Sequence, residues 1–430
     1  MFFSSHRLAV QTPLFSYTYA ELDQQVQTLA CYFSSQGLNP GDCVVFCIQD
    51  SFKLLLCLLS SFKMGLIAFP INPKLSQFEK SLCMSYSQAK LMMTDLPLLT
   101  SFQAFNRSVS CQQLATYLLT SGTTGNPKIA VHTFGQLQSS AICSQSVIPV
   151  TTDSLWLLQL PLFHVSGIGI MLRTLSYQGC LLISDQKQSV SDLLSQYPIT
   201  HLSLVYPQFS DFLSQNMNSS SLKHMLLGGS SFNPALLETA IQRQLPIHFS
   251  YGLTEYSSQV ATSLVGTFMP LYLLEGVSVR TKDKEIEIKG PSLFQGYLQE
   301  NGQIHLHLNA EGYFKTGDLG EIELNQLSIL GRKDHLFISG GENIYPEEIE
   351  AIMMKLPEVK QVVVIPKQHP YFGFRPVAFL QYFKPITEEE MRSFLASFLP
   401  KYKIPDSFFP WPIDLKDSGK INRAVFYQYI

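Results

Sequence analysis

The segment Tyr117-Leu-Leu-Thr-Ser-Gly-Thr-Thr-Gly-Asn-Pro-Lys128 runs from a short apolar stretch into a loop of hydroxyl and glycine residues that ends in a lysine. Glycines allow backbone N–H groups to approach phosphate oxygens closely, the hydroxyls add donors, and Lys128 adds a positive charge. An ordinary surface loop could have the same composition. A P-loop NTPase is excluded because its motif, GxxxxGKS/T, is broken where Asn126-Pro127 follows Gly125.

Outward from this loop, short apolar runs alternate with helical patterns. Thr18-Tyr-Ala-Glu21 forms a capping box, and apolar residues then recur at helical spacing until Gly37. The apolar runs that suit buried strands are residues 43–48, 66–71, 117–120, 155–160, 180–184, 201–205 and 224–227. Continuously apolar strands that alternate with helices indicate α/β layers around largely parallel sheets.

The pattern changes near residue 276. Residues 277–288 and 321–330 alternate as antiparallel strands do, and a short polar break follows at 331–335. Beyond the break we expect helices at 346–356 and after the capping residue Thr387, with a strand at 361–365. The predicted fold is α/β: a large N-terminal domain of α/β layers with an antiparallel β subdomain (1–332), and a small mobile α+β C-terminal domain (333–430).

Four further motifs follow the loop along the chain. They are Tyr251-Gly-Leu-Thr-Glu255, Tyr313-Phe-Lys-Thr-Gly-Asp318, the string from Gly331 to Glu350, and Leu415-Lys-Asp-Ser-Gly-Lys420. A carboxylate such as Glu255 suits a hard cation, and an ionised Asp318 can accept hydrogen bonds from two adjacent hydroxyls. Taken singly, each could be an exposed carboxylate, a turn residue, a helix start or a solvated lysine.

Thr120–Lys128 fits the pattern S/T-S/G-G-S/T-T-G-x-P-K at every position, and the other four motifs occur in matching order. The chain therefore resembles the adenylate-forming superfamily, which includes acyl-CoA synthetases, firefly luciferase and peptide-synthetase adenylation domains. The resemblance implies that ATP, Mg²⁺ and coenzyme A take part. It implies that these residues hold the nucleotide phosphates: Thr120, Ser121, Gly122, Thr123, Thr124, Gly125 and Lys128.

The same resemblance gives roles to the second and third motifs. Tyr251 and Gly252 would line the nucleotide site, and Thr254 would contact its phosphate side and the adenylate. Glu255 would help to hold Mg²⁺. Asp318 would accept both ribose hydroxyls, and Arg332 would reach the ribose or a phosphate.

The last two motifs imply a moving domain. Lys420 would be the catalytic lysine of adenylate formation. Rotation about the hinge residue Asp334 would then withdraw it and bring Ser339, Gly340 and Gly341 to line the channel for the pantetheine arm of coenzyme A. Many relatives have a lysine where this chain has Ser339, a departure that leaves the adenylation residues intact.

A narrower resemblance concerns the acid. Residues 156–173, 201–205, 226–229 and 337–342 resemble the 2-succinylbenzoate–CoA ligase family of menaquinone synthesis. One carboxylate of that substrate is activated, and the other must enter the pocket charged, which requires a partner. Arg173 lies in an otherwise apolar segment and could supply that charge; alternatively it is a surface residue at a helix end.

Other residues around the acid pocket follow from the same resemblance. His164 is similar to the gate of the acyl pocket, or it is a packed core residue between Phe163 and Val165. Ser203 and the turn at Gly228 and Gly229 would form the wall of the pocket.

Bulk properties limit the partners. The formal net charge is −3, which gives no reason to expect nucleic acid or an anionic membrane. No apolar run approaches the roughly 20 residues of a membrane span. The eight cysteines form no CxxC pair and have no zinc spacing, so we expect buried, reduced thiols in a cytoplasmic protein.

Three alternatives remain at this point. The chain could act on another aromatic or medium-chain acid, or it could be a stand-alone adenylation domain that loads a carrier protein. A non-catalytic binding protein is disfavoured because Lys128, Glu255, Asp318, Arg332 and Lys420 are all present. A homo-oligomer stays possible.

Overall fold

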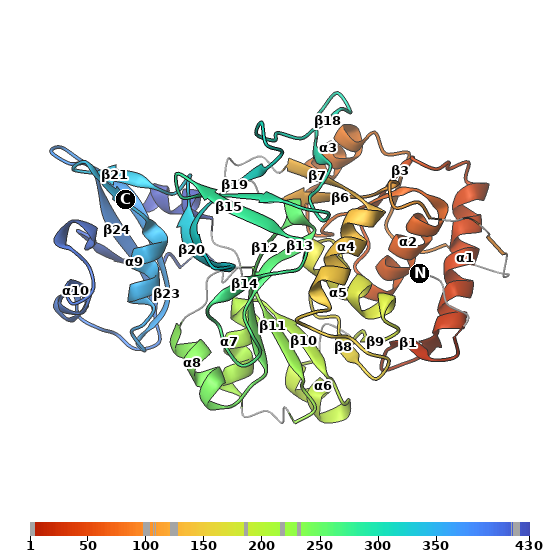
Figure 1. Ribbon diagram of the computed structural model, residues 1–430, viewed down its shortest axis with the longest axis horizontal. Helices are drawn as coiled ribbons and strands as arrows, with labels where there is room; N and C mark the ends of the chain where they lie inside the picture. Colours follow the sequence, from red (N-terminus) through yellow and green to blue (C-terminus); the bar gives the residue numbers. More distant parts are fainter. Residues whose placement is uncertain are drawn as a thin grey trace.

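Three sheets organise the computed structural model, which describes residues 5–97, 104–105, 107, 109–120, 128–184, 188–215, 220–229, 234–413, 415 and 422–430. Two large sheets with their helices form most of the molecule, and the third sheet lies at one end with the C-terminus (Figure 1). The predicted α/β class with a separate C-terminal unit is confirmed.

The first sheet contains the strand that precedes the glycine-rich loop. Its order is β18-β17-β7-β6-β4-β3-β5, with parallel pairing among β3, β4, β5 and β6. The strands are β3 (Cys43–Phe46), β4 (Ile67–Pro70), β5 (Leu91–Met93), β6 (Leu114–Thr120), β7 (Lys128–Thr133), β17 (Gly296–Leu298) and β18 (Ile304–His305). The antiparallel pair β6–β7 places Thr120 opposite Lys128. Residues 121–125 of the predicted phosphate loop lie outside the described residues.

The second sheet has 13 strands in the order β15-β16-β19-β20-β14-β13-β12-β11-β10-β8-β9-β1-β2. Its parallel part is β8 (Leu155–Leu157), β9 (Cys180–Leu182), β10 (His201–Leu204), β11 (His224–Leu227) and β12 (Ile247–Leu253), with β1 (Leu8–Gln11) and β2 (Ser16–Thr18) at one edge. Its antiparallel part is β13 (Ser258–Thr262), β14 (Leu271–Leu273), β15 (Ser278–Lys282), β16 (Glu285–Lys289), β19 (Phe314–Glu323) and β20 (Gln326–Arg332). The expected antiparallel subdomain is thus continuous with the parallel sheet.

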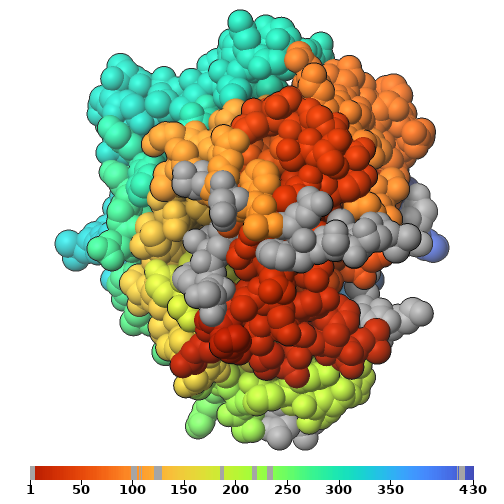
Figure 2. All heavy atoms as spheres, turned by 90° about the vertical axis from the view of Figure 1, so that its right-hand side faces the viewer, coloured from red at the N-terminus to blue at the C-terminus, as the bar shows by residue number. Residues whose placement is uncertain are grey.

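Helices pack on these two sheets. They are α1 (Tyr19–Ser35), α2 (Ser51–Met64), α3 (Gln77–Ser87), α4 (Phe134–Ser144), α5 (Val165–Ser176), α6 (Val190–Gln196), α7 (Tyr206–Ser214) and α8 (Pro234–Gln242), with a 3₁₀ turn, η1, at Thr254–Tyr256. The capping box predicted at Thr18 and Glu21 is present. Helix α2 is buried along almost its whole length because it lies in the main apolar core with α1 and α5. Figure 2 views the molecule from the side on which α1 lies in Figure 1, and red and orange N-terminal residues form much of that face.

The third sheet has the order β22-β21-β24-β23, with β25 beside β24. It comprises β21 (Phe337–Ser339), β22 (Glu342–Ile344), β23 (Val359–His369), β24 (Gly373–Tyr382) and β25 (Phe408–Pro410), with α9 (Pro346–Met353), α10 (Glu388–Ala396) and the 3₁₀ turns η2 (Lys401–Lys403) and η3 (Arg423–Tyr429). It has its own apolar core, to which α9 and α10 contribute. A division near residue 333 remains our proposal for the domain boundary.

The cysteine prediction is partly wrong. All eight are free thiols, but Cys111 is exposed and Cys31, Cys143 and Cys180 are only half-buried. Within the described residues, no helix combines the length and apolar character that a bilayer crossing requires.

Candidate active site

Four residues of three predicted motifs meet beside strands β12, β19 and β20. The Tyr251 hydroxyl donates to Asp318 Oδ2 at 2.6 Å, and Arg332 Nη1 donates to Asp318 Oδ1 at 2.9 Å. Arg332 Nε also donates to Asp334 Oδ1 at 3.1 Å. Asp318 and Arg332 are neighbours because β19 and β20 pair them directly. Asp318 therefore lies inside a strand, and the turn considered from the sequence is wrong.

The protonation states in this cluster suit polar recognition. Burial, together with the Asp318 carboxylate, raises the pKa of the Tyr251 hydroxyl well above its ordinary value. Burial opposes the charge on Arg332, but the Asp318 and Asp334 carboxylates outweigh it and raise the pKa of the guanidinium. Tyr251 thus remains a donor, Arg332 remains a cation, and Asp318 is held in a fixed orientation as an acceptor.

The 3₁₀ turn η1 carries Thr254 and Glu255, and its backbone is fixed from two sides. His132 Nε2 donates to the Thr254 carbonyl oxygen at 2.7 Å, and the Phe294 amide donates to the Glu255 carbonyl oxygen at 2.9 Å. Burial lowers the pKa of His132 to about 4. His132 is therefore neutral near pH 7 and holds the turn without adding charge beside Glu255.

Tyr297 contacts both Glu255, the predicted magnesium ligand, and Lys128, the predicted phosphate-binding lysine. Its hydroxyl donates to Glu255 Oε1 at 2.6 Å, and the Lys128 ammonium lies over its ring, 5.0 Å from the centroid. The contact arises because β17 pairs with β7, so that Tyr297 stands opposite Ala130. The sequence analysis missed Tyr297, since nothing in its local sequence marks it as a site residue.

One chain segment links these groups to Arg173. Strand β12, turn η1 and strand β13 form a tight hairpin in which Gly252 packs against Ser258; a Cβ at position 252 would lie 2.1 Å from the Ser258 carbonyl oxygen. Arg173 Nη2, from helix α5, donates to Ser258 Oγ at 3.0 Å. The segment 251–258 therefore touches Asp318, Tyr297 and Arg173.

Arg173 is buried, with a side chain that has few partners. The residue is 2% exposed, so the alternative of a surface residue at a helix end is wrong. Its guanidinium packs on Gly169, where a Cβ would lie 3.3 Å from two of its nitrogens, and its Nε has no hydrogen-bond partner among the described residues. Burial lowers its pKa to about 10, so it carries an incompletely satisfied positive charge near pH 7.

The remaining predicted acid-pocket residues lie on neighbouring elements. Ser203 is buried on β10, and its Oγ accepts a hydrogen bond from Trp156 Nε1 at 3.2 Å. Gly228 and Gly229 follow β11, with Gly228 against Ser250. His164 is the N-cap residue of α5 and is exposed, so the alternative of a packed core residue is wrong.

The predicted coenzyme A residues form a β-hairpin of the third sheet. Ser339 pairs with Glu342, and Gly340 and Gly341 make the turn with φ values of 58° and 90°. A two-residue turn with both φ values positive favours glycine at both positions. The Gly340 amide donates to the Phe372 carbonyl oxygen at 2.9 Å, which ties this hairpin to the β23–β24 connection.

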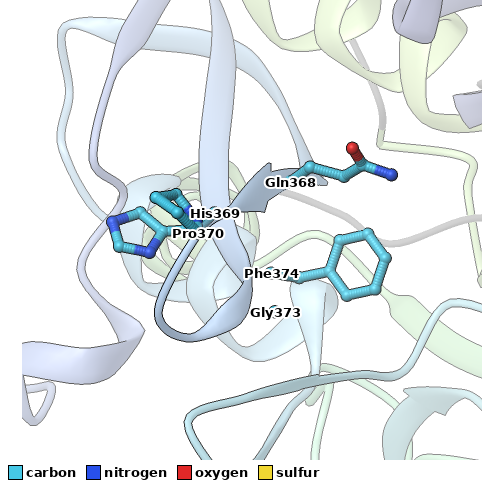
Figure 3. Close-up of a pocket in the computed structure, with 5 residues that line it drawn as sticks. All are labelled: Gln368, His369, Pro370, Gly373 and Phe374. Carbon is cyan, nitrogen blue, oxygen red and sulfur yellow. The ribbon is translucent and has the colours of Figure 1, made fainter.

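A pocket of about 430 Å³ lies at that connection and is lined by Gln368, His369, Pro370, Gly373 and Phe374. Figure 3 shows Gln368 and Phe374 projecting to one side of the hairpin and His369 to the other. None of the residues predicted from the motifs lines this pocket. The catalytic candidate Lys420 lies outside the described residues.

Two family models match the chain. The model of the AMP-binding enzyme family matches residues 4–298, and that of the AMP-binding enzyme C-terminal domain matches residues 348–420. The chain is 34% identical over 422 residues to a 2-succinylbenzoate–CoA ligase of Salmonella typhimurium, which covers 95% of this chain and 92% of that relative.

Solved structures of related proteins have a similar fold. The o-succinylbenzoate CoA synthetase MenE of Bacillus subtilis, in complex with the acyl-adenylate intermediate OSB-AMP, matches 97% of this chain and 95% of that one, with a TM-score of 0.87 and 27% identity. The same protein in complex with ATP and magnesium ion matches with a TM-score of 0.87 and 28% identity, over 97% and 96% of the two chains.

Proposed function

The chain belongs to the AMP-binding enzyme family, and on that basis we propose that it is an ATP-dependent acid–CoA ligase whose acid is 2-succinylbenzoate. A carboxylate and ATP give an acyl-adenylate and pyrophosphate, and the adenylate and coenzyme A then give the acyl-CoA and AMP. The observation that carries the proposal is that residues 251–258 contact three predicted site residues. Asp318 and Arg173 are contacted directly, and Lys128 is linked to Glu255 by the side chain of Tyr297.

The donor and acceptor set fits a nucleotide. Asp318 is held by Tyr251 and Arg332 as an acceptor for two ribose hydroxyls, and Lys128 is exposed at the end of the phosphate loop. Glu255 suits magnesium because a hard cation takes carboxylate oxygens together with phosphate oxygens and water. Bound there, the ion would neutralise charge that develops on the phosphates.

In adenylate formation, a carboxylate oxygen of the acid attacks the α-phosphorus and the bond to pyrophosphate breaks. Negative charge on the phosphates rises at that moment, and fixed positive groups lower the barrier. We assign Lys128 to the leaving pyrophosphate and Lys420 to the α-phosphate. Thr254 is held in place through its carbonyl oxygen by His132, so its hydroxyl can be aimed at the adenylate.

Arg173 supports the choice of acid. Among the described residues, the buried Arg173 guanidinium has one hydrogen-bond partner, the neutral Ser258 Oγ, and a buried charge with so few partners favours binding of an anion. We assign it to the carboxylate of 2-succinylbenzoate that is not activated. Ser203, Gly228 and Gly229 would form the wall of the same pocket, and His164 would stand at its entrance.

The second half-reaction needs coenzyme A as the acceptor. We assign the Gly340-Gly341 turn to the pantetheine channel because its two glycines present backbone without side chains. Rotation of the C-terminal unit about Asp334 would withdraw Lys420 from the active site and bring this turn into it.

The test is pyrophosphate release with ATP over a panel of acids that includes 2-succinylbenzoate, benzoate and a medium-chain fatty acid, with and without free coenzyme A. We expect 2-succinylbenzoate to be preferred and free coenzyme A to be acylated. Preference for a monocarboxylic acid would overturn the substrate, and absence of acyl-CoA despite adenylate formation would favour a carrier-protein acceptor.

A further inference from the structure

Tyr297 stands between two oppositely charged groups of the proposed nucleotide site. Its hydroxyl is 2.6 Å from Glu255 Oε1, and its ring face lies under the Lys128 ammonium. The two contacts use different parts of one rigid side chain, so the ring fixes where both charges lie relative to each other.

The Tyr297 hydroxyl donates to the Glu255 carboxylate, and a hydrogen bond from a phenol to a carboxylate is of the strong, charge-assisted kind.

Packing and strand pairing fix the position of the Tyr297 ring. Tyr297 packs edge-on against Phe294, with 4.9 Å between the ring centroids, and Phe294 donates its amide to the Glu255 carbonyl oxygen. Strand β17 is held in register against β7, which begins with Lys128. The tyrosine, the carboxylate and the lysine thus belong to one framework.

Two consequences follow for an ion and a triphosphate. One oxygen of Glu255 accepts from the phenol, so Oε2 is the oxygen that would be presented to a magnesium ion, which is usually bound through one or two carboxylates together with substrate phosphates and water. The lysine is held over the ring and away from direct pairing with Glu255, an ion pair that would otherwise neutralise both groups.

Building on the proposed function, we propose that Tyr297 is a positioning residue that presents Glu255 to magnesium through one oxygen and keeps Lys128 free for phosphate. It acts through Glu255 and Lys128 and touches no reacting atom. Loss of Tyr297's hydroxyl should therefore change how ATP binding depends on the Mg²⁺ concentration, a step that precedes adenylate formation.

The experiment measures ATP binding by calorimetry over a series of Mg²⁺ concentrations, without acid or coenzyme A. For Tyr297→Phe, which removes one oxygen and keeps the ring, we expect the Mg²⁺ concentration at half effect to rise about tenfold, as loss of a hydrogen bond to a charged group predicts. Affinity for ATP without Mg²⁺ should change little.

Tyr256→Phe is the matched control. Tyr256 is adjacent to Glu255, is 1% exposed, and its hydroxyl has no hydrogen-bond partner among the described residues. The same chemical change there should leave the magnesium dependence unaltered, and circular dichroism should report both variants as folded.

A double-mutant cycle with Glu255→Gln decides whether Tyr297 acts through Glu255. We expect Tyr297→Phe to add no further shift in the Glu255→Gln background. An unchanged magnesium dependence in Tyr297→Phe, or an equal shift in both backgrounds, overturns the inference and leaves the proposed function standing. Wild-type protein that binds ATP without any magnesium dependence would instead overturn the proposed nucleotide site together with this inference.

Discussion

Replacing Arg173 by methionine removes a buried charge and keeps much of the volume of the side chain. The pKa of Arg173 falls from an ordinary 12.5 to about 10 on burial, which at about 1.36 kcal/mol for each tenfold change in the protonation equilibrium corresponds to about 3 kcal/mol. That is the cost of holding the guanidinium charged inside the folded protein. We therefore expect Arg173→Met to leave the free energy of unfolding unchanged or to raise it by up to about 3 kcal/mol.

The same substitution should impair recognition of the dicarboxylic acid. Loss of a buried charged partner typically costs a ligand about 2–5 kcal/mol, so we expect the KM for 2-succinylbenzoate to rise about 30-fold or more. A monocarboxylic analogue has no carboxylate for Arg173, and its KM should change little. Arg173→Met would thus keep or raise the free energy of unfolding while it lowers the preference for the dicarboxylic acid.

The assays are urea unfolding at pH 7 and pyrophosphate release with the two acids. Arg7→Met, at an exposed position, is the matched control and should alter neither measurement. A loss of stability by several kcal/mol together with an equal loss of activity toward both acids would refute the reasoning, because it would identify Arg173 as a structural residue.

Three further predictions follow from the site and the core. Lys420→Ala should abolish adenylate formation and largely spare thioester formation from a pre-made adenylate; equal loss in both half-reactions would contradict the two-state assignment. Tyr251→Phe should raise the Kd for ATP about tenfold through the lost hydrogen bond to Asp318, and calorimetry would show an unchanged Kd if Asp318 does not bind ribose. Burial lowers the pKa of His132 to about 4 and, with the neighbouring His224 also contributing, that of His201 to about 3. The unfolded chain then binds more protons below about pH 6.5, so the free energy of unfolding should fall as the pH drops from about 6.5 toward 3, by up to about 1.4 kcal/mol per pH unit for each histidine; a flat profile by urea unfolding would contradict it.

Local signals in the sequence located many elements correctly. The capping boxes at Thr18 and Thr387 begin helices α1 and α10 because their hydrogen bonds join residues three apart. The apolar runs matched strands such as β10 and β11, since buried parallel strands need no polar face. Helix α9 begins at Pro346, as expected.

Local sequence patterns did not predict which strands pair when they lie far apart in the chain. Nothing in the sequence indicated that the antiparallel strands continue the parallel sheet, because this depends on β13 pairing with β12 and β14 with β20. Tyr297 was missed for the same reason: its contacts depend on the register of β17 against β7.

The motifs supplied the residues proposed for the candidate site but not the environment of each side chain. Arg173 could have been buried or exposed, since a residue near a helix end fits either, and its burial depends on the β12–β13 hairpin. His164 was predicted to be the gate of the acyl pocket, with a packed core residue as the alternative; it is the N-cap residue of α5 and is exposed, so the alternative is wrong.

One guanidinium, that of Arg332, is shared between Asp318 in the nucleotide cluster and Asp334 at the expected hinge. In the proposed function, a nucleotide would compete for the Asp318 oxygens, redistribute the donors of Arg332 and so alter its hold on Asp334. Thermodynamic reciprocity would then require the orientation of the C-terminal unit to change the affinity for nucleotide by the same factor. Through this arginine, the proposed binding of nucleotide and the proposed rotation of the C-terminal unit would be coupled in one equilibrium.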